Sequence, residues 1–147
     1  MTRGLADTSV FIARESGRPL DVDRLPDDMA VSVVTIGELR AGVLAAADTT
    51  TRDRRLGTLT RALVLDPVPV DAAVADAWGR LRLLLSEAGL RMSVNDSWIA
   101  ATALALGVPV VTQDADYVEL GGLPVVRVRR IQARFSAGRG RRRPRRP

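Results

Sequence analysis

The 147-residue sequence contains no cysteine, no histidine and no lysine, so all 22 of its basic residues are arginine. Without cysteine there are no disulfides and no thiolate metal sites. Without histidine there is no imidazole to serve as base, nucleophile or metal ligand. The absence of lysine removes lysine chemistry in the same way. Any metal that this chain binds must therefore be held by oxygen atoms.

Long apolar runs and aromatic residues are also scarce. No run approaches the roughly 18 to 20 residues that a bilayer-spanning helix needs. The first residues lead directly into an expected strand without the apolar core of a signal peptide. We therefore expect a cytoplasmic protein with no membrane partner. Aromatic residues make up 3% of the sequence, and we interpret Trp78 and Trp98 as core residues and not as stacking platforms.

The formal net charge of +5 is concentrated at one end of the chain. Residues 136–147 contain six arginines, and without them 16 basic residues face 17 acidic ones, a balance of about −1. The body of the chain is therefore not a basic domain. A segment rich in Arg, Gly and Pro cannot bury apolar surface. We expect one globular domain over residues 1–135, which is long enough for a real core, and a disordered tail over residues 136–147.

Short apolar segments alternate with helical patterns along the body. This alternation predicts an α/β fold in which helices cover both faces of a mostly parallel sheet. Asp71 and Gly89 bracket the longest expected helix, and Gly107 supplies a left-handed stop for the last one. The expected strands are 4–6, 29–34, 63–70, 108–111 and 123–128, and the expected helices begin after Asp7 and cover 35–44, 52–62, 72–88 and 95–106.

Acidic residues stand where these elements meet. Asp7 follows the first expected strand, Asp114 and Asp116 follow the fourth, and Glu38 and Asp96 lie near helix starts. In parallel α/β sheets these positions share one edge, where ligand sites form. Like charges gathered there are costly unless a cation lies among them or a proton is bound. A hard divalent ion held by carboxylates and water is the simplest answer.

Structural roles remain open for two of these acids. Asp7 stands where an N-cap residue is expected, because a helix should begin directly after it. Thr35 and Glu38 have the spacing of a capping box, which would give Glu38 a purely local role. Both acids are equally placed to face the strand ends. The sequence alone does not decide between a local capping role and a role in the acidic site.

Four segments with acidic residues follow one another along the chain: Asp7-Thr8-Ser9, residues 33–39 (VVTIGEL), residues 95–103 (NDSWIAATA) and residues 111–117 (VTQDADY). Together they resemble the acidic motifs of PIN-domain ribonucleases, and the third is most similar to the VapC toxins of type II toxin-antitoxin pairs. The resemblance covers roughly residues 4 to 130. Any one motif is weak, whereas four in order with suitable spacing are specific.

The resemblance implies a three-layer α/β/α PIN-like domain and an endoribonuclease dependent on Mg²⁺, with Mn²⁺ as a substitute. Carried over by position, Asp7, Glu38, Asp96 and Asp116 form the catalytic acidic cluster. The metal ligands implied are Asp7, Asp96, Asp114 and Asp116, with Asp114, Ser9 and Thr112 in supporting roles. The implied cleavage leaves a 5′-phosphate and a 3′-hydroxyl, and Glu38 would orient the attacking water or complete the metal coordination.

The implied partners are an RNA substrate, a cognate antitoxin protein and a second copy of the chain in a homodimer. Surrounding arginines would grip backbone phosphates, with Arg40, Arg91 and the tail as candidates. The sequence does not indicate which RNA is cut, which surface the antitoxin covers, or what the tail does.

Two other classes of protein with acidic residues at strand ends require residues that this chain lacks. A receiver domain needs a lysine near its phosphoacceptor, and an aspartyl-nucleophile phosphatase needs a second Asp where Ser9 stands. Both are excluded. The remaining alternative is a non-catalytic PIN-like RNA-binding or assembly module, in which the acids cap helices and the arginine-rich tail binds RNA.

Overall fold

In the part of the chain that the structure describes, the central sheet has four strands, all parallel, in the order β2-β1-β3-β4. A computed structural model describes residues 1–114 and 122–128, and all statements below concern these residues. The strands are β1 (Arg3–Ala6), β2 (Asp28–Val31), β3 (Val110–Thr112) and β4 (Val125–Arg127). The predicted parallel α/β sheet is confirmed.

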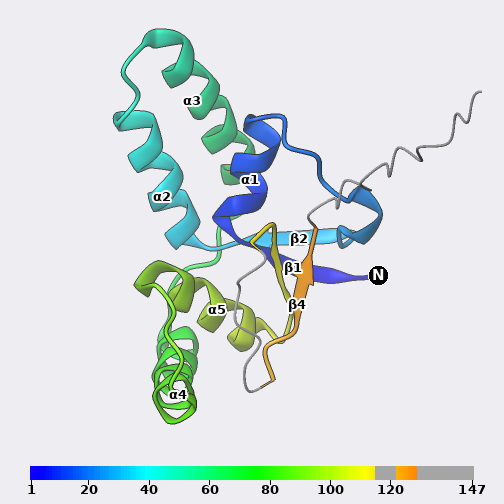
Figure 1. Ribbon diagram of the computed structural model, residues 1–147, viewed down its shortest axis with the longest axis vertical. Helices are drawn as coiled ribbons and strands as arrows, with labels where there is room; N and C mark the ends of the chain where they lie inside the picture. The colour runs from blue at the N-terminus through cyan, green and yellow to red at the C-terminus, as the bar shows by residue number, and fades with distance from the viewer. Residues whose placement is uncertain (115–121, 129–147) are drawn as a thin grey trace, which may run out of the picture.

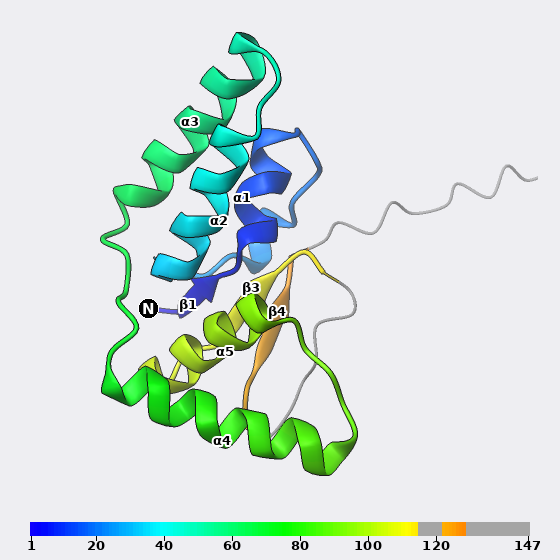
Figure 2. The same ribbon diagram turned by 90° about the vertical axis from the view of Figure 1, so that its left-hand side faces the viewer.

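Five α-helices pack on this sheet in two layers (Figures 1 and 2). One layer holds α1, α2 and α3, and the other holds α4 and α5, with α4 packed against α5. A 3₁₀ turn at Val22–Arg24 lies between α1 and β2. The three-layer α/β/α prediction is therefore confirmed. The helices are α1 (Thr8–Glu15), α2 (Val33–Leu44), α3 (Thr49–Leu63), α4 (Ala72–Ala88) and α5 (Val94–Leu106).

The alternation of side chains along the central strands divides the core into two clusters. Ala6 and Val111 belong to the cluster with α1, α2 and α3, whereas Leu5 and Val110 belong to the cluster with α4 and α5. Successive residues of a strand point to opposite faces. A strand buried on both faces has no polar alternation, which is why these strands read as continuous apolar runs.

The last two helices follow the predicted start and stop signals. Asp71 Oδ1 accepts a 2.9 Å hydrogen bond from the Val74 amide, and Gly89 ends α4 with φ of 65°. These signals place α4 at Ala72–Ala88, as predicted. Ser93 caps α5, which begins at Val94, one residue before the expected start, and Gly107 ends it with φ of 66°.

The boundary between β2 and α2 differs from the prediction. The strand ends at Val31, and Ser32 Oγ accepts a 3.0 Å hydrogen bond from the Val34 amide as the N-cap. Thr35 is a buried residue inside the helix, so the predicted Thr35–Glu38 capping box is wrong. The two β-branched valines resemble a strand, but the hydroxyl directly before them starts the helix.

The predicted strand over residues 63–70 is also wrong. Helix α3 begins at Thr49, where Asp48 caps it, and continues through Leu63. Asp66 then adopts a left-handed backbone with φ of 54°. The following Pro67 and Pro69 have no amide to donate to a ladder. Only one parallel bridge remains here, between Ser32 and Val68.

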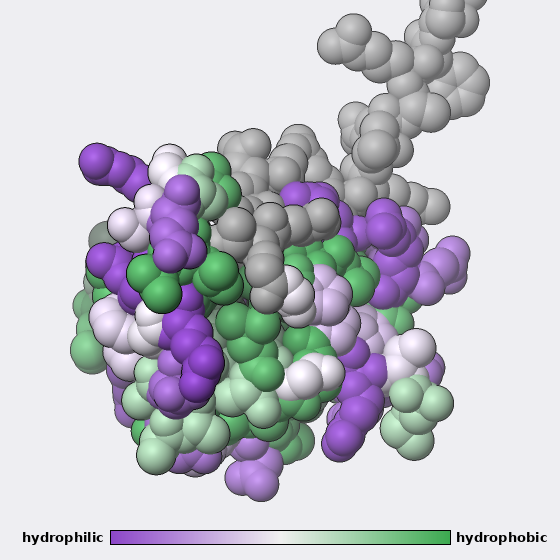
Figure 3. Space-filling view, turned by 90° about the horizontal axis from the view of Figure 1, so that it is seen from below, coloured by the Kyte–Doolittle hydropathy of each residue, from purple (hydrophilic) through white to green (hydrophobic). Residues whose placement is uncertain are grey.

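Residues 115–121 and 129–147 lie outside the described part of the chain. Asp116 and the whole predicted tail are among these residues. Within the described ranges, no helix combines the length and apolarity needed to cross a membrane. On the face seen from the α4 end, hydrophobic residues (green) alternate with strongly hydrophilic ones (purple) (Figure 3).

Candidate active site

The parallel sheet gathers the acidic residues at the carboxyl edge of its strands. Asp7 directly follows β1 and Asp114 lies two residues beyond β3. Helices α1 and α2 start at this edge because each follows a strand, and α5 starts there because it runs back to the beginning of β3. Helix N-termini carry partial positive charge and attract anions. The edge therefore combines carboxylates with three helix starts.

Asp7 is the most buried of these acids, with 3% of its surface exposed. Its Oδ1 accepts hydrogen bonds from the Ser9 amide at 3.0 Å and the Ser9 hydroxyl at 2.5 Å. Its Oδ2 accepts a 2.6 Å hydrogen bond from the Thr112 hydroxyl. Asp7 therefore caps α1 and is also fixed against β3, so the two interpretations of this residue are compatible.

Ser9 and Thr112 each link Asp7 to the backbone that follows β3. The Gln113 amide donates to Ser9 Oγ at 2.9 Å, and the Asp114 amide donates to Thr112 Oγ1 at 3.0 Å. A hydroxyl has one proton to donate. Because each hydroxyl gives its proton to Asp7, each accepts from an amide. This arrangement fixes the start of the segment that carries Asp114 relative to the Asp7 carboxylate.

Glu38 is half-buried in the second turn of α2 and is held from α1. The Thr8 hydroxyl donates a 2.6 Å hydrogen bond to Glu38 Oε1, and Thr8 Oγ1 also lies 3.1 Å from Thr35 Oγ1. Glu38 therefore contacts Thr8 of another helix and does not take part in the predicted capping box with Thr35. The role of Thr8 was not predicted from the sequence, in which its position between Asp7 and Ser9 in the first acidic motif is the signal for it.

Electrostatic coupling shows that the carboxylates lie near one another. Burial raises the pKa of the Asp7 carboxyl, and the charge of Asp96 raises it further, against the hydrogen bonds from Ser9 and Thr112. Burial also raises the pKa of Asp96. The charges of Glu38 and Asp114 add to that rise, and a hydrogen bond with Ser93 opposes it. Asp96, in the first turn of α5, thus interacts electrostatically with each of the other three acids.

The chemistry of this donor set suits a hard divalent cation. Carboxylate and hydroxyl oxygens surround the edge, and Mg²⁺ is bound through oxygen ligands. A cation would relieve the repulsion that raises the pKa values of Asp7 and Asp96. Among residues 1–114 and 122–128, no group of three acidic side chains is close enough to hold an ion. Asp116, the remaining predicted ligand, lies outside the described residues.

The structure thus brings together most of the predicted site. Asp7, Ser9 and Thr112 are joined by hydrogen bonds, and the charge of Asp96 acts on Asp7. The charges of Glu38 and Asp114 act in turn on Asp96. Of the predicted phosphate-binding arginines, Arg40 and Arg91 are both exposed. Trp78 and Trp98 are half-buried and stack on each other, with ring centroids 4.5 Å apart and planes at 7°. The prediction that they are core residues therefore holds only in part.

A three-layer α/β/α domain with acidic residues at the carboxyl edge of a parallel sheet is the arrangement that the resemblance to PIN domains predicted. Comparison with known protein families supports the same class. The model of the PIN domain matches residues 5–123, which is most of the chain.

Individual relatives narrow the assignment. The chain is 50% identical to Ribonuclease VapC5 of Mycobacterium tuberculosis over 87% of its own length and 95% of that protein. It is 47% identical to Ribonuclease VapC4 of the same organism, over 86% of its length and 97% of that protein. The crystal structure of VapBC-5, a member of the VapBC family of toxin-antitoxin systems from the same bacterium, contains a similar chain. That chain matches with a TM-score of 0.79 and 44% identity, over 87% of this chain and 100% of that one. The protein therefore belongs to the PIN-domain family, and within it to the VapC ribonucleases.

Proposed function

We propose that this protein is an endoribonuclease that acts as the toxin of a toxin-antitoxin pair. It hydrolyses RNA phosphodiester bonds at the carboxyl edge of its sheet. The observation that carries the proposal is the state of Asp7, which is 3% exposed, ionisable, held by Ser9 and Thr112, and close enough to Asp96 for repulsion. Such an arrangement is costly for stability alone, and perturbed acids of this kind cluster at functional sites.

The reaction depends on a divalent ion, with Mg²⁺ as the natural one and Mn²⁺ as a substitute. Asp7, Asp96, Asp114 and Asp116 would hold it. A bound divalent ion neutralises phosphate charge and makes water nucleophilic near neutral pH. The chain has no histidine or lysine that could do this instead. The acidic edge repels RNA until a cation is present, so metal binding and RNA binding support each other.

The neighbouring side chains prepare the carboxylates for this role. Ser9 and Thr112 fix the orientation of Asp7. Three hydrogen bonds use three of the four lone pairs of the carboxylate, so one lone pair of Oδ2 is left for a cation. Thr8 holds one oxygen of Glu38, so the other oxygen is available to orient the attacking water. The N-termini of α1, α2 and α5 favour the negative charge of the phosphate that approaches.

The regulatory partner in this proposal is a small antitoxin protein that covers the site and blocks cleavage. Support comes from the similarity to a chain of VapBC-5, a member of the VapBC family of toxin-antitoxin systems. We place both proteins in the cytoplasm, where RNA substrates are abundant. In this proposal the toxin also forms a homodimer, as the family resemblance implies.

The proposal is tested with a mixed structured RNA and purified protein in Mg²⁺, in Mn²⁺ and in EDTA. Wild type is compared with Asp96→Asn and with Asp76→Asn, a control on α4 whose carboxylate pairs with exposed Arg80. We expect fragments with either metal, none with EDTA, and none from Asp96→Asn, while Asp76→Asn cuts like wild type. Equal fragment patterns from Asp96→Asn and wild type would refute the assignment.

The alternative, a non-catalytic module that binds RNA through the tail, gives the opposite result when residues 136–147 are deleted. A nuclease lacking these residues still cuts RNA with metal. A binding module loses its RNA affinity on the same deletion, and neither form cuts. Full-length protein that binds RNA without cutting it, under every metal condition, would favour the module.

A further inference from the structure

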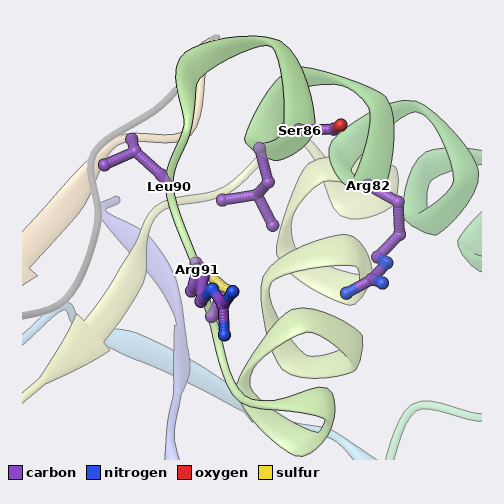
Figure 4. Close-up of a pocket in the computed structure, with 6 residues that line it drawn as sticks. Arg82, Ser86, Leu90 and Arg91 are labelled. Carbon is purple, nitrogen blue, oxygen red and sulfur yellow. The ribbon is translucent and has the colours of Figure 1, made fainter.

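A pocket of about 310 Å³ lies where α4 ends and the chain turns back to α5 (Figure 4). Its volume is at the lower end of the roughly 300 to 1,000 Å³ typical of small-ligand sites. Among residues 1–114 and 122–128, the lining combines two arginines with an apolar wall and includes no acidic residue. The lining residues are Arg82, Leu85, Ser86, Leu90, Arg91 and Met92.

The two arginines are available to an anion. Figure 4 shows Arg82 extending from α4 and Arg91 from the connecting segment, with both guanidinium groups directed towards the same end of the pocket in this view. Within residues 1–114 and 122–128, the guanidinium-carboxylate ion pairs are Arg3–Asp28 and Arg80–Asp76. Arg82 and Arg91 make no such pair there. Two guanidinium groups that line one pocket offer it charged hydrogen-bond donors suited to a phosphate.

The Arg82 guanidinium lies over an aromatic side chain. Its guanidinium carbon lies 5.5 Å from the centroid of the Trp78 ring, a cation-π geometry. Trp78 stacks on Trp98 and donates a 2.9 Å hydrogen bond from Nε1 to Ser97 Oγ. Ser97 directly follows Asp96. A stack anchored beside the acidic cluster therefore supports one side of the pocket, so less side-chain freedom is lost when an anion binds.

The pocket is connected to the acidic edge by a short stretch of chain. Arg91 lies five residues before Asp96. Five residues span at most about 18 Å even when fully extended, and here the last of them are already helical. An anion between the arginines is therefore within a few nucleotides of a phosphate at the carboxylates. Leu85, Leu90 and Met92 supply apolar surface for the sugar or base attached to it.

We propose that this pocket is a phosphate subsite for the RNA chain, in which Arg82 and Arg91 bind one backbone phosphate and the apolar wall contacts its nucleoside. The inference rests on the proposed ribonuclease function, because RNA is the polyanion that such an enzyme must hold on both sides of the bond it cuts. Phosphate contacts position a nucleic acid without reading its sequence. The subsite therefore sets the register of the RNA on the enzyme and does not select the cut.

The test measures the affinity of a short mixed-sequence single-stranded RNA as a function of salt concentration. All proteins carry Asp96→Asn, so that the RNA stays intact in Mg²⁺. The double variant Arg82→Ala/Arg91→Ala and the two single variants are compared with Arg80→Ala, which removes one exposed arginine of α4 that lies outside the pocket lining. The slope of log K against log salt is negative, and the loss of one phosphate contact makes it less steep by about 0.7 for a single strand. We expect this less steep slope and a weaker affinity in the double variant, and neither change in Arg80→Ala.

A kinetic measurement in the otherwise wild-type chain adds a second readout. Because the subsite holds substrate and transition state alike, the double variant should raise KM while kcat stays unchanged. Thermal unfolding of each variant verifies that the exposed substitutions leave the fold intact. An unchanged salt slope and KM in the folded double variant would overturn the subsite, as would equal effects from Arg80→Ala. Competition by an acidic peptide with no change in the RNA slope would assign the pocket to a protein partner and overturn it too.

The failure of this inference is distinct from the failure of the proposed function. The comparison of wild type with Asp96→Asn in the cleavage assay decides whether the protein is a metal-dependent ribonuclease. The salt slope and KM of the arginine variants decide whether the pocket binds RNA. A nuclease with an unchanged slope in the double variant remains a nuclease and lacks this subsite.

Discussion

Thr112 Oγ1 donates a 2.6 Å hydrogen bond to Asp7 Oδ2, and the two residues are 105 positions apart in the sequence. Asp7 follows the first strand and Thr112 ends the third, and β1 and β3 are neighbours in the sheet. The bond is fully buried. It ties the first acidic motif to the last one and makes the geometry of the site a property of the sheet.

Replacing Thr112 by valine should therefore damage both stability and activity. A buried carboxylate that loses one donor costs about 1 to 3 kcal/mol in unfolding free energy. The pKa of Asp7 should rise further, because the hydrogen bond from Thr112 lowers it. We expect a cleavage rate at least about tenfold lower, which corresponds to ~1.4 kcal/mol. Thr112→Ser should keep both properties. Denaturant unfolding and RNA cleavage measure them.

A control for Thr112→Val is Thr60→Val on α3. The Thr60 hydroxyl is exposed and donates to the Leu56 carbonyl of its own helix. Its loss should leave cleavage unchanged. Similar loss of cleavage in both valine variants would show that the Asp7–Thr112 bond has no special role.

The Thr8–Glu38 bond gives a second prediction. Thr8→Val removes the donor that holds Glu38 Oε1 at 2.6 Å, so the Glu38 side chain gains freedom at the edge. We expect kcat to fall severalfold with little change in KM, since Glu38 acts on the reacting water. Thr8→Ser retains the hydroxyl and should restore kcat. If Thr8→Ser were as impaired as Thr8→Val, the methyl group and not the hydrogen bond would be responsible.

The pKa values of Asp7 and Asp96 predict a pH dependence of stability for the metal-free protein. Both pKa values are raised above 3.8 in the folded state. A carboxyl of this kind contributes most stability below its unfolded pKa, and that contribution is lost as pH rises through the folded pKa. In EDTA, Asp96→Asn should remove its share of this loss, so the variant gains stability over wild type as pH rises from acid to neutral.

Thermal unfolding across this pH range, with the metal-free protein, measures the difference between wild type and Asp96→Asn. Asp76→Asn serves as the surface control, for which the difference should stay nearly constant with pH. The interpretation is wrong if Asp96→Asn and wild type lose stability in parallel as the pH is raised.

Metal should reverse this penalty. A ligand that binds only the folded state stabilises it by about 2.7 kcal/mol at one hundred times its Kd. Titration of Mg²⁺ into wild type should raise the melting temperature until the site is saturated, and subsequent EDTA should lower it again. Asp96→Asn should respond weakly. A melting temperature indifferent to Mg²⁺ and Mn²⁺ in wild type would contradict carboxylate-bound metal.

The N-cap of α2 gives a prediction about the fold alone. Ser32 Oγ accepts from the Val34 amide, and the residue is fully buried. Ser32→Ala should destabilise the protein by about 1 kcal/mol, whereas Ser32→Gly should cost only a few tenths beyond any packing loss. Denaturant unfolding of both variants checks this. An Ala variant as stable as wild type would show that another group satisfies the first turn of the helix.

The sequence alone determined the features that depend on local signals. Asp71 and Gly89 placed α4 correctly because capping and a left-handed stop are local interactions. The continuous apolar runs around Leu5 and Val110 indicated strands buried on both faces. The order of the four acidic motifs, together with the absence of histidine, cysteine and lysine, was sufficient to suggest a carboxylate site and its family.

The tertiary structure decided whatever depends on contacts between distant segments. Residues 63–70 look like a strand, but α3 continues through Leu63, and Asp66 and two prolines leave only one bridge. Glu38 fits a local capping box in the sequence, yet its partner is Thr8 in another helix. The pairing of Asp7 with Thr112, and of Arg82 with Arg91 around one pocket, likewise appears only in the fold. Local propensity is encoded in neighbouring residues, whereas a site is formed by the sheet order and helix packing that bring remote side chains within hydrogen-bonding reach.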